Sequence, residues 1–212
     1  MNPFSGCSIV SCGTLRPELT YLQDSGFLRP DLLTFTRPGL HEDSKELERQ
    51  LRKRIDKVKE HSDRIIVVYG DLCFMDSSQP DRTVDDILHE EGENITRIDA
   101  HHCVDMLASE RERKEMTQGE KVWWMTPGWI LYRQQVFLDW DKGKAVETFP
   151  KHTGGARVLD GIDFFEKYTM EHPEELLDYS DWMGVPIDRQ KISLDRFKSL
   201  LLDRTAGLDK TT

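Results

Sequence analysis

The length, composition and charge of the chain set bounds on its class. It has 212 residues, of which 37% are hydrophobic and 32% are charged, as in a globular protein that builds its core without disulfides. Its formal net charge of −10 argues against a nucleic-acid partner, because phosphate backbones attract basic surfaces. The sequence has no apolar run long enough for a membrane span and no signal-peptide pattern, so we expect a cytoplasmic protein with reduced cysteines.

Segments with strand-like and helix-like patterns alternate along the chain. Strands are expected over residues 8–12, 32–36, 64–69, 95–98, 121–125, 156–159 and 186–192. Helices are expected over residues 16–23, 42–61 (with Ser44 as N-cap), 83–91, from about 132, 164–170, 173–182 and 194–202. We expect the tail to fray from about residue 204.

This alternation predicts the fold class. It is typical of an α/β protein with an open, mostly parallel sheet and helices on both faces, in the doubly wound, Rossmann-like arrangement. The sequence shows no internal repeat and no convincing linker, so we expect a single domain over residues 1–212.

Reactive side chains follow the first four predicted strands. Cys12, His41 and Cys73 come after the first three, and His102-Cys103 follows the fourth. Ligands of open parallel sheets bind outside the carboxyl ends of the strands, and thiolate and imidazole are the ligands that zinc and iron–sulfur clusters take. The order therefore predicts one metal site with three cysteine ligands, completed by His41, His102 or an exogenous group. The alternative is three separate buried thiols and a surface histidine.

Three further residues are candidates for contact with a cofactor or substrate. Gly13 and Gly70 would let the backbone approach a ligand closely, or else simply form tight turns. Trp124 belongs to a cluster of three tryptophans that either walls a substrate pocket or packs in the core. No Walker motif, G-x-G-x-x-G or G-x-S-x-G sequence is present.

These motifs resemble those of domain-of-unknown-function family 1638, in the same order and over nearly the whole chain. The matching elements are Cys12-Gly13, Leu40-His41, Tyr69-Gly70-Asp71-Leu72-Cys73 and His102-Cys103. The chain departs from the family at Phe74, where Gly is frequent, and at Val104, where an aromatic residue is common. The resemblance implies an α/β fold with a metal or cluster site at the matched residues. It also implies one-carbon or thiol chemistry, because similar proteins accompany corrinoid methyl-transfer proteins.

Several functions remain open at this point. The leading interpretation is a zinc protein that acts on a small molecule in methyl-transfer or thiol chemistry. A [4Fe–4S] cluster held by the three cysteines is the alternative cofactor. A non-catalytic accessory protein for a corrinoid methyltransferase is a second class, with a corrinoid or methyltransferase protein as partner. A third class is an enzyme in which Cys103 or Cys73 is the nucleophile and His102 the base.

Overall fold

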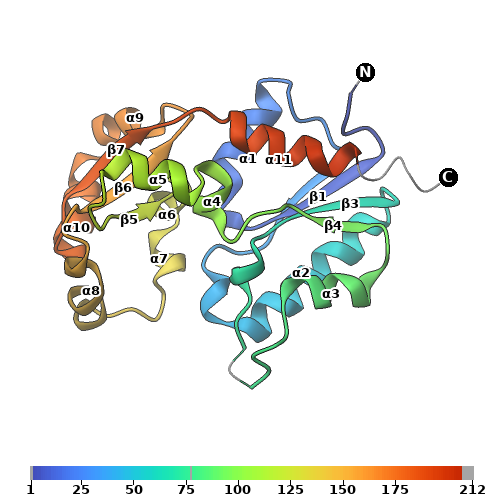
Figure 1. The fold of residues 1–212 in the computed structure, drawn as a ribbon, viewed down its shortest axis with the longest axis horizontal. Coiled ribbons are helices and arrows are strands. Elements are labelled where there is room, and N and C mark those ends of the chain that lie inside the picture. Colours follow the sequence, from blue (N-terminus) through green and yellow to red (C-terminus); the bar gives the residue numbers. More distant parts are fainter. Residues whose placement is uncertain (1, 77, 207–212) are drawn as a thin grey trace.

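The computed structural model describes residues 2–76 and 78–206 (Figure 1). Its strands form two open sheets, and every pair of neighbouring strands is parallel. The first sheet has the order β2 (Leu32–Phe35), β1 (Cys7–Ser11), β3 (Arg64–Val68), β4 (Ile95–Arg97). The second has the order β5 (Trp123–Met125), β6 (Ala156–Asp160), β7 (Ile187–Lys191). The predicted α/β class is confirmed, with two parallel sheets in place of the one expected.

Helices and short 3₁₀ turns connect the strands. The α-helices are α1 (Arg16–Asp24), α2 (Ser44–Lys59), α3 (Val84–Glu91), α4 (Cys103–Leu107), α5 (Glu110–Thr117), α6 (Pro127–Leu131), α7 (Arg133–Val136), α8 (Lys142–Thr148), α9 (Phe164–Glu171), α10 (Pro173–Met183) and α11 (Asp195–Ala206). The 3₁₀ turns are η1 (Gly13–Leu15), η2 (Leu40–Glu42), η3 (Asp71–Cys73) and η4 (Phe149–Lys151). Within the described residues, none of these helices has the length and apolar character needed to cross a bilayer.

The first sheet is covered on both faces, as a parallel sheet requires. Side chains of a strand alternate between faces, so neighbouring residues of β1 and β3 enter different cores. Ile9 and Val68 pack with residues of α1, α4 and α11, whereas Val10 and Val67 pack with residues of α2 and α3. Figure 1 shows α1 and α11 on one side of this sheet and α2 and α3 on the other.

Helix α2 shows how the sequence specifies an element locally. Leu47, Leu51, Ile55 and Val58 recur at helical spacing, and all four side chains are buried against the first sheet. The N-cap is Asp43, whose carboxylate accepts a hydrogen bond from the Glu46 amide at 3.0 Å. The prediction of Ser44 as N-cap was therefore wrong by one residue. Asp and Ser are both favoured at the N-cap, so residue type alone does not distinguish Asp43 from Ser44.

The first strand of the second sheet, β5, is followed directly by a helix that packs against the first half of the chain. Helix α6 lies directly against η1, and a Cβ at Gly128 would be 2.0 Å from the carbonyl oxygen of Thr14. This contact occupies the end of β1, and β5 pairs with β6 in a separate sheet. The helix expected from about Tyr132 is instead two short helices that begin at Pro127, a residue suited to a first turn.

The end of the chain differs from the expectation of a frayed tail. Helix α11 continues to Ala206, because Phe197 and Leu201 pack in the same core as α1 and α4. The tail expected from about residue 204 is thus helical over 204–206, and its remainder lies outside the described residues.

Candidate functional site

Four of the five predicted metal ligands line one small cavity at the carboxyl end of the first sheet. Cys12 follows β1, His41 lies in η2, Cys73 ends η3 and Cys103 begins α4. The cavity has a volume of about 20 Å³, which suits one water-sized occupant. The fold therefore brings thiols that are distant in sequence to the wall of one cavity.

The three cysteines of this cavity are half-buried, and their thiols influence one another. Burial raises the pKa of Cys103 to about 12, and the Cys12 sulfur adds to the rise. Burial also raises the pKa of Cys73, with further contributions from Cys103 and Cys12. The pKa of Cys12 is raised by burial and partly lowered by Thr14, whose hydroxyl lies 3.1 Å from the sulfur. Without a cation, all three thiols are protonated at neutral pH.

His41 is the histidine at the same cavity. Its ring stacks on Trp129 of α6, with ring centroids 5.8 Å apart and planes inclined by 23°. Burial lowers the pKa of His41, so the imidazole is neutral at pH 7. Gly39, which precedes η2 with a φ of +81°, allows this turn to pack against the backbone of α7. Neutral imidazole is the form that binds metal ions.

His102 lies apart from the small cavity and is engaged as a helix cap. Its Nδ1 accepts a hydrogen bond from the Asp105 amide at 3.1 Å, at the start of α4. An acceptor Nδ1 leaves the proton on Nε2. Burial and nearby Arg113 lower the pKa of His102, which keeps the ring neutral. In this tautomer, neither ring nitrogen offers a lone pair to a metal ion or to a thiol proton.

His101 forms a separate, exposed pair with Asp71. The His101 Nδ1 lies 3.0 Å and 3.1 Å from the two carboxylate oxygens of Asp71. This hydrogen bond raises the pKa of His101 and lowers that of Asp71, although burial acts against the latter. Neither residue lines the thiol cavity. The pair joins η3 to the loop before α4, and so holds the segments that carry Cys73 and Cys103 side by side.

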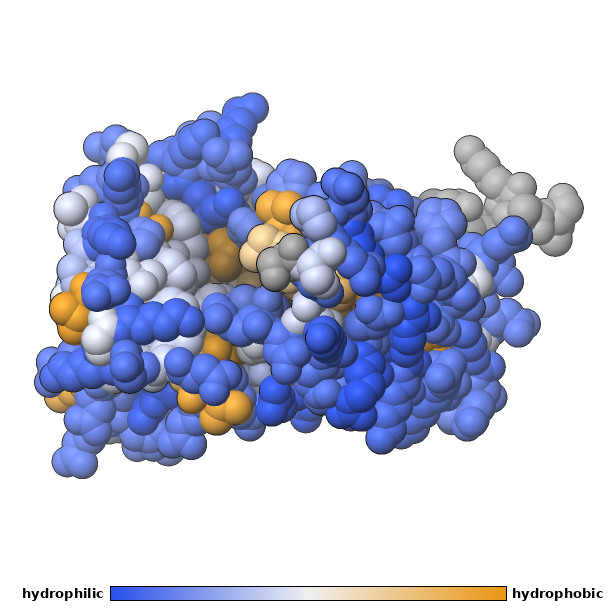
Figure 2. All heavy atoms as spheres, turned by 90° about the horizontal axis from the view of Figure 1, so that it is seen from below, coloured by the Kyte–Doolittle hydropathy of each residue, from blue (hydrophilic) through white to orange (hydrophobic). Residues whose placement is uncertain are grey.

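A larger cavity of about 330 Å³ adjoins the thiol cavity and shares four of its residues, His41, Cys73, Cys103 and Trp129. This volume lies in the range of small-molecule sites. Its remaining walls are mainly apolar and comprise Leu72, Met75, His102, Val104, Arg113, Val122, Trp123 and Trp124. Figure 2 shows hydrophobic atoms beside a hollow on a largely hydrophilic face.

The glycines predicted to approach a cofactor are packed against other backbone segments. A Cβ at Gly70 would lie 2.1 Å from the carbonyl oxygen of His101, and one at Gly13 would lie 2.6 Å from that of Thr36. Gly70 lines the thiol cavity, whereas Gly13 lines neither cavity. Both glycines therefore have a packing role that brings the ligand-bearing loops together. Trp124 lines the larger cavity and also packs against the core beneath α11.

The donor atoms of the thiol cavity are of the types that zinc prefers, but they lie too far apart to hold one ion together. Three thiols and a neutral imidazole match the ligands of four-coordinate zinc. In the described part of the chain, no three His, Cys, Asp or Glu side chains lie close enough to hold a metal ion. A metal ion would be held by this set only if these side chains lay closer together than they do in the structure.

One buried carboxyl near the site escaped the sequence analysis. Glu18 of α1 has no exposed surface, and neither carboxylate oxygen has a hydrogen-bond partner among the described residues. Burial raises the pKa of Glu18 to about 8, with a smaller contribution from Asp160, and Glu18 in turn raises that of Cys103. The sequence does contain a pattern that indicates the burial of Glu18. This residue shares one helical face with Leu15 and Leu22, and the other members of that face are apolar.

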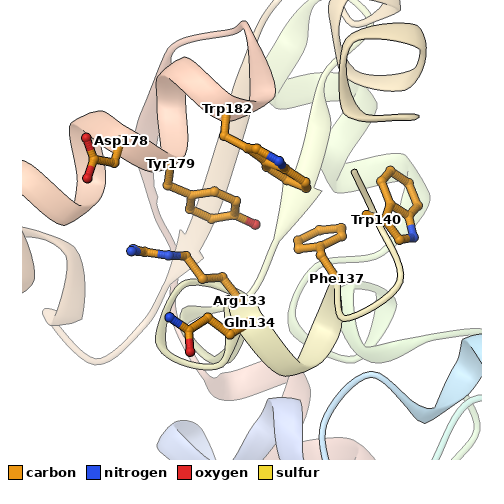
Figure 3. A pocket seen from close by; sticks show the side chains of 7 residues that line it. All are labelled: Arg133, Gln134, Phe137, Trp140, Asp178, Tyr179 and Trp182. Atoms are coloured by element: carbon orange, nitrogen blue, oxygen red, sulfur yellow. The ribbon is translucent and has the colours of Figure 1, made fainter. Parts of the chain in front are cut away.

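A further hollow of about 210 Å³ lies away from these residues, beside the second sheet. Figure 3 shows the rings of Phe137, Tyr179 and Trp182 turned toward one another, with Arg133 beside them. The Arg133 guanidinium lies 5.7 Å from the Tyr179 ring centroid, and the Lys144 ammonium lies 4.2 Å from that of Trp140. Two of the four aromatic rings are thus already paired with cations of the chain itself, and no predicted ligand lines this hollow.

The fold and the thiol cavity define an α/β protein with a cysteine- and histidine-lined cavity at the carboxyl edge of a parallel sheet. A protein-family model described as "Protein of unknown function (DUF1638)" matches residues 35–201, well over half of the chain. The chain therefore belongs to this family, which confirms the family that its motifs resemble. The matched segment contains His41, Cys73 and Cys103, and it begins after Cys12. No curated protein and no solved structure matches the chain.

Proposed function

We propose that this protein binds one zinc ion through Cys12, Cys73, Cys103 and His41, and that it acts on a small molecule in the adjoining cavity. The observation that carries the proposal is the convergence of three half-buried cysteines on one cavity. Thiolates in apolar surroundings are costly unless a cation compensates their charge. A divalent metal ion is the partner that removes this cost, since thiolate is the ligating form of cysteine.

The size of the thiol cavity favours zinc over a [4Fe–4S] cluster. A volume of about 20 Å³ admits one ion or one water molecule. A cluster of four irons and four sulfides is several times larger, and its entry would require the surrounding loops to separate. Trp129 and Tyr69, which also wall the cavity, are bulky and partly or fully buried. We therefore propose zinc as the resident metal.

A cysteine-nucleophile mechanism has less support. It needs a base within reach of a thiol, and His102 was the sequence candidate for that role. The Nδ1 of His102 is occupied by the Asp105 amide, so its Nε2 carries a proton. Burial meanwhile raises the pKa of Cys103 to about 12, which leaves little thiolate at neutral pH. Metal coordination does not require such a base.

The residues of the larger cavity would bind the substrate and exclude water from it. Trp123, Trp124 and Trp129 form apolar walls that exclude water and hold an apolar part of the substrate. Arg113, half-buried at the same cavity, offers a positive charge to an anionic substrate group. Four protein ligands fill a tetrahedral zinc ion, so a thiol or water molecule would reach it only by displacing His41 or by adding as a fifth ligand; zinc would then lower the pKa of that molecule and keep it as a nucleophile. The family resemblance supports a methyl group or a thiol as the transferred or accepting group.

Metal analysis of cysteine variants tests the proposed zinc site. We expect anaerobically purified protein to be colourless and to contain one zinc ion per chain, whereas a cluster would give brown visible absorption. Cys73→Ser should lose zinc, and Cys7→Ser should keep it, because Cys7 lies at the amino end of β1. Full zinc occupancy in the Cys73 variant would remove Cys73 from the ligand set.

A transfer assay then tests the proposed reaction. Zinc-loaded protein is incubated with a small thiol and a methyl donor, either a methylated thiol or a methylated corrinoid, and methylated product is measured. We expect zinc-dependent product formation that Trp124→Ala weakens while zinc content stays unchanged. A zinc-loaded protein without turnover for any donor would favour the accessory-protein alternative.

A further inference from the structure

A fourth cavity, at the carboxyl end of β2, is lined by an unusual number of basic side chains. Its volume is about 390 Å³. Five cationic residues contribute to its walls, namely Arg16, Arg37, Arg49, Lys53 and Arg54. The remaining lining residues are Phe35, Thr36, Pro38, Gln50 and Gln135, so no carboxylate lines the cavity. The walls of this cavity are positively charged, whereas the chain as a whole has a net charge of −10.

Most of these cations lack a partner of opposite charge. Arg49 forms an ion pair with Glu46, at 2.6 Å between the nearest nitrogen and oxygen atoms. For the other four cations, the described part of the chain places no carboxylate within ion-pair distance. Elsewhere on α2 the pattern is different, because Arg52 pairs with Glu48, Glu90 and Glu91. Glu46 therefore compensates part of the positive charge of this group, since Arg49 and, more weakly, Arg37 lower its pKa, whereas Arg16, Lys53 and Arg54 have no ion-pair partner among the described residues.

The basic residues are held in place by local contacts. Arg49 and Lys53 are separated by one turn of α2, as are Gln50 and Arg54, so they project from one region of the helix. The Gln50 amide oxygen accepts a hydrogen bond from the Arg37 amide at 2.9 Å, which ties the loop after β2 to the helix. Like charges four residues apart destabilise a helix, so the cluster carries a cost until an anion binds.

The ring of Phe35 orients one further member of the cluster. The Arg16 guanidinium lies over this ring, 4.6 Å from its centroid. A guanidinium stacked in this way keeps its N–H donors in a fixed plane, which suits bidentate hydrogen bonding to phosphate oxygens. Arg16 comes from α1, Arg37 from the loop after β2 and the others from α2, so the cavity is built from three elements.

We propose that this cavity binds a small molecule bearing two or more linked phosphate groups. Five cations exceed what a single phosphate can pair with, whereas a pyrophosphate or triphosphate carries enough charge and oxygens for several bidentate contacts. The cavity volume is in the range of small-ligand sites. A nucleic acid is disfavoured, because its extended backbone needs a basic surface larger than this cavity and the chain is acidic overall.

The proposed phosphate site is independent of the proposed zinc site. Neither a thiol nor an imidazole lines the basic cavity. The two cavities are linked through one hydrogen bond between the hydroxyls of Thr36 and Tyr69, since Thr36 lines the basic cavity and Tyr69 lines the thiol cavity. Both cavities lie at the carboxyl edge of the first sheet, and the buried side chains of Thr36 and Tyr69 lie between them. Phosphate binding is expected whether or not zinc is present.

Calorimetric titration of the full chain tests this proposal. Orthophosphate, pyrophosphate and tripolyphosphate are titrated separately at low ionic strength. We expect affinity to rise with each added phosphate group and to fall as salt is added. The double variant Lys53→Gln/Arg54→Gln and the loop variant Arg37→Gln should each weaken tripolyphosphate binding at least about tenfold. The control is Lys57→Gln, which removes an exposed charge from the same helix outside the cavity and should have little effect.

Several outcomes would overturn the proposal. These are equal affinity for orthophosphate and tripolyphosphate, an equal loss of binding in the Lys57 variant, or binding in wild type that none of the cavity variants changes. Tighter binding to double-stranded DNA than to tripolyphosphate would assign the surface to a nucleic acid instead. Zinc content of the same variants should stay unchanged, so a failure here is distinguishable from a failure of the zinc proposal.

Discussion

Glu18→Gln tests the deepest electrostatic feature of the structure, a buried carboxyl without a hydrogen-bond partner among the described residues. Folding raises the pKa of Glu18 from 4.5 to about 8, mainly because burial penalises the charged form. The folded state then holds its proton more tightly than the unfolded state does. Below the ordinary pKa of a glutamate, Glu18 therefore does not lower the free energy of unfolding. As the pH rises from there toward about 8, the free energy of unfolding falls.

The size of this effect follows from the pKa difference. Each pKa unit corresponds to about 1.4 kcal/mol, so the rise from 4.5 to about 8 is worth about 5 kcal/mol in all, of which the wild type should lose about 3.5 kcal/mol of unfolding free energy between about pH 5 and about pH 8. Glutamine has nearly the same shape and carries no charge in either state. The Glu18→Gln variant should therefore escape this loss and gain stability relative to wild type as the pH rises.

Urea unfolding monitored by circular dichroism measures this difference. Other groups titrate in both proteins, so the quantity of interest is the gap between variant and wild type at each pH. The control Asp24→Asn removes an exposed carboxylate from the end of the same helix. A gap for Glu18→Gln that is the same at both ends of the pH range would refute a buried carboxyl with a raised pKa.

Three further substitutions probe the site and its supports. Gly70→Ala places a Cβ 2.1 Å from a carbonyl oxygen, so urea unfolding should show a loss of at least about 2 kcal/mol, whereas Gly143→Ala, at an exposed helical position, should be nearly neutral. Asp43→Ala removes the N-cap of α2 and should lower the unfolding free energy by about 1 kcal/mol in the same assay. Competition with a zinc chelator should show at least about tenfold weaker zinc binding for His41→Ala, but little change for His102→Ala.

The repeating patterns of the sequence predicted most of the elements. The continuous apolar run of β3 and the helical spacing of Leu47, Leu51, Ile55 and Val58 in α2 are local signals, and each gave its element within a few residues. The cysteines follow strands in the sequence, and this placement predicted that the residues of the thiol cavity lie close together, because parallel strands share one carboxyl edge.

Other features depend on contacts that no local pattern records. The strands form two sheets, and the second half of the chain packs on the first through the close approach of Gly128 to Thr14, residues that are far apart in sequence. His41 lines the thiol cavity and His102 does not, because the His41 ring stacks on Trp129 while the His102 Nδ1 accepts a hydrogen bond from a helix amide. The basic cavity was overlooked because its five cations come from three elements and stand in a chain whose net charge is negative.

X-ray absorption at the zinc edge tests the zinc proposal most directly, since it reports the atoms bound to the metal. For zinc-loaded protein, we predict three sulfur neighbours at about 2.3 Å and one nitrogen neighbour at about 2.0 Å, from Cys12, Cys73, Cys103 and His41. His41→Ala should keep the sulfur neighbours and replace the imidazole nitrogen with the oxygen of a water molecule. A first shell made only of nitrogen and oxygen would contradict the account, because zinc would then be bound away from the three thiols.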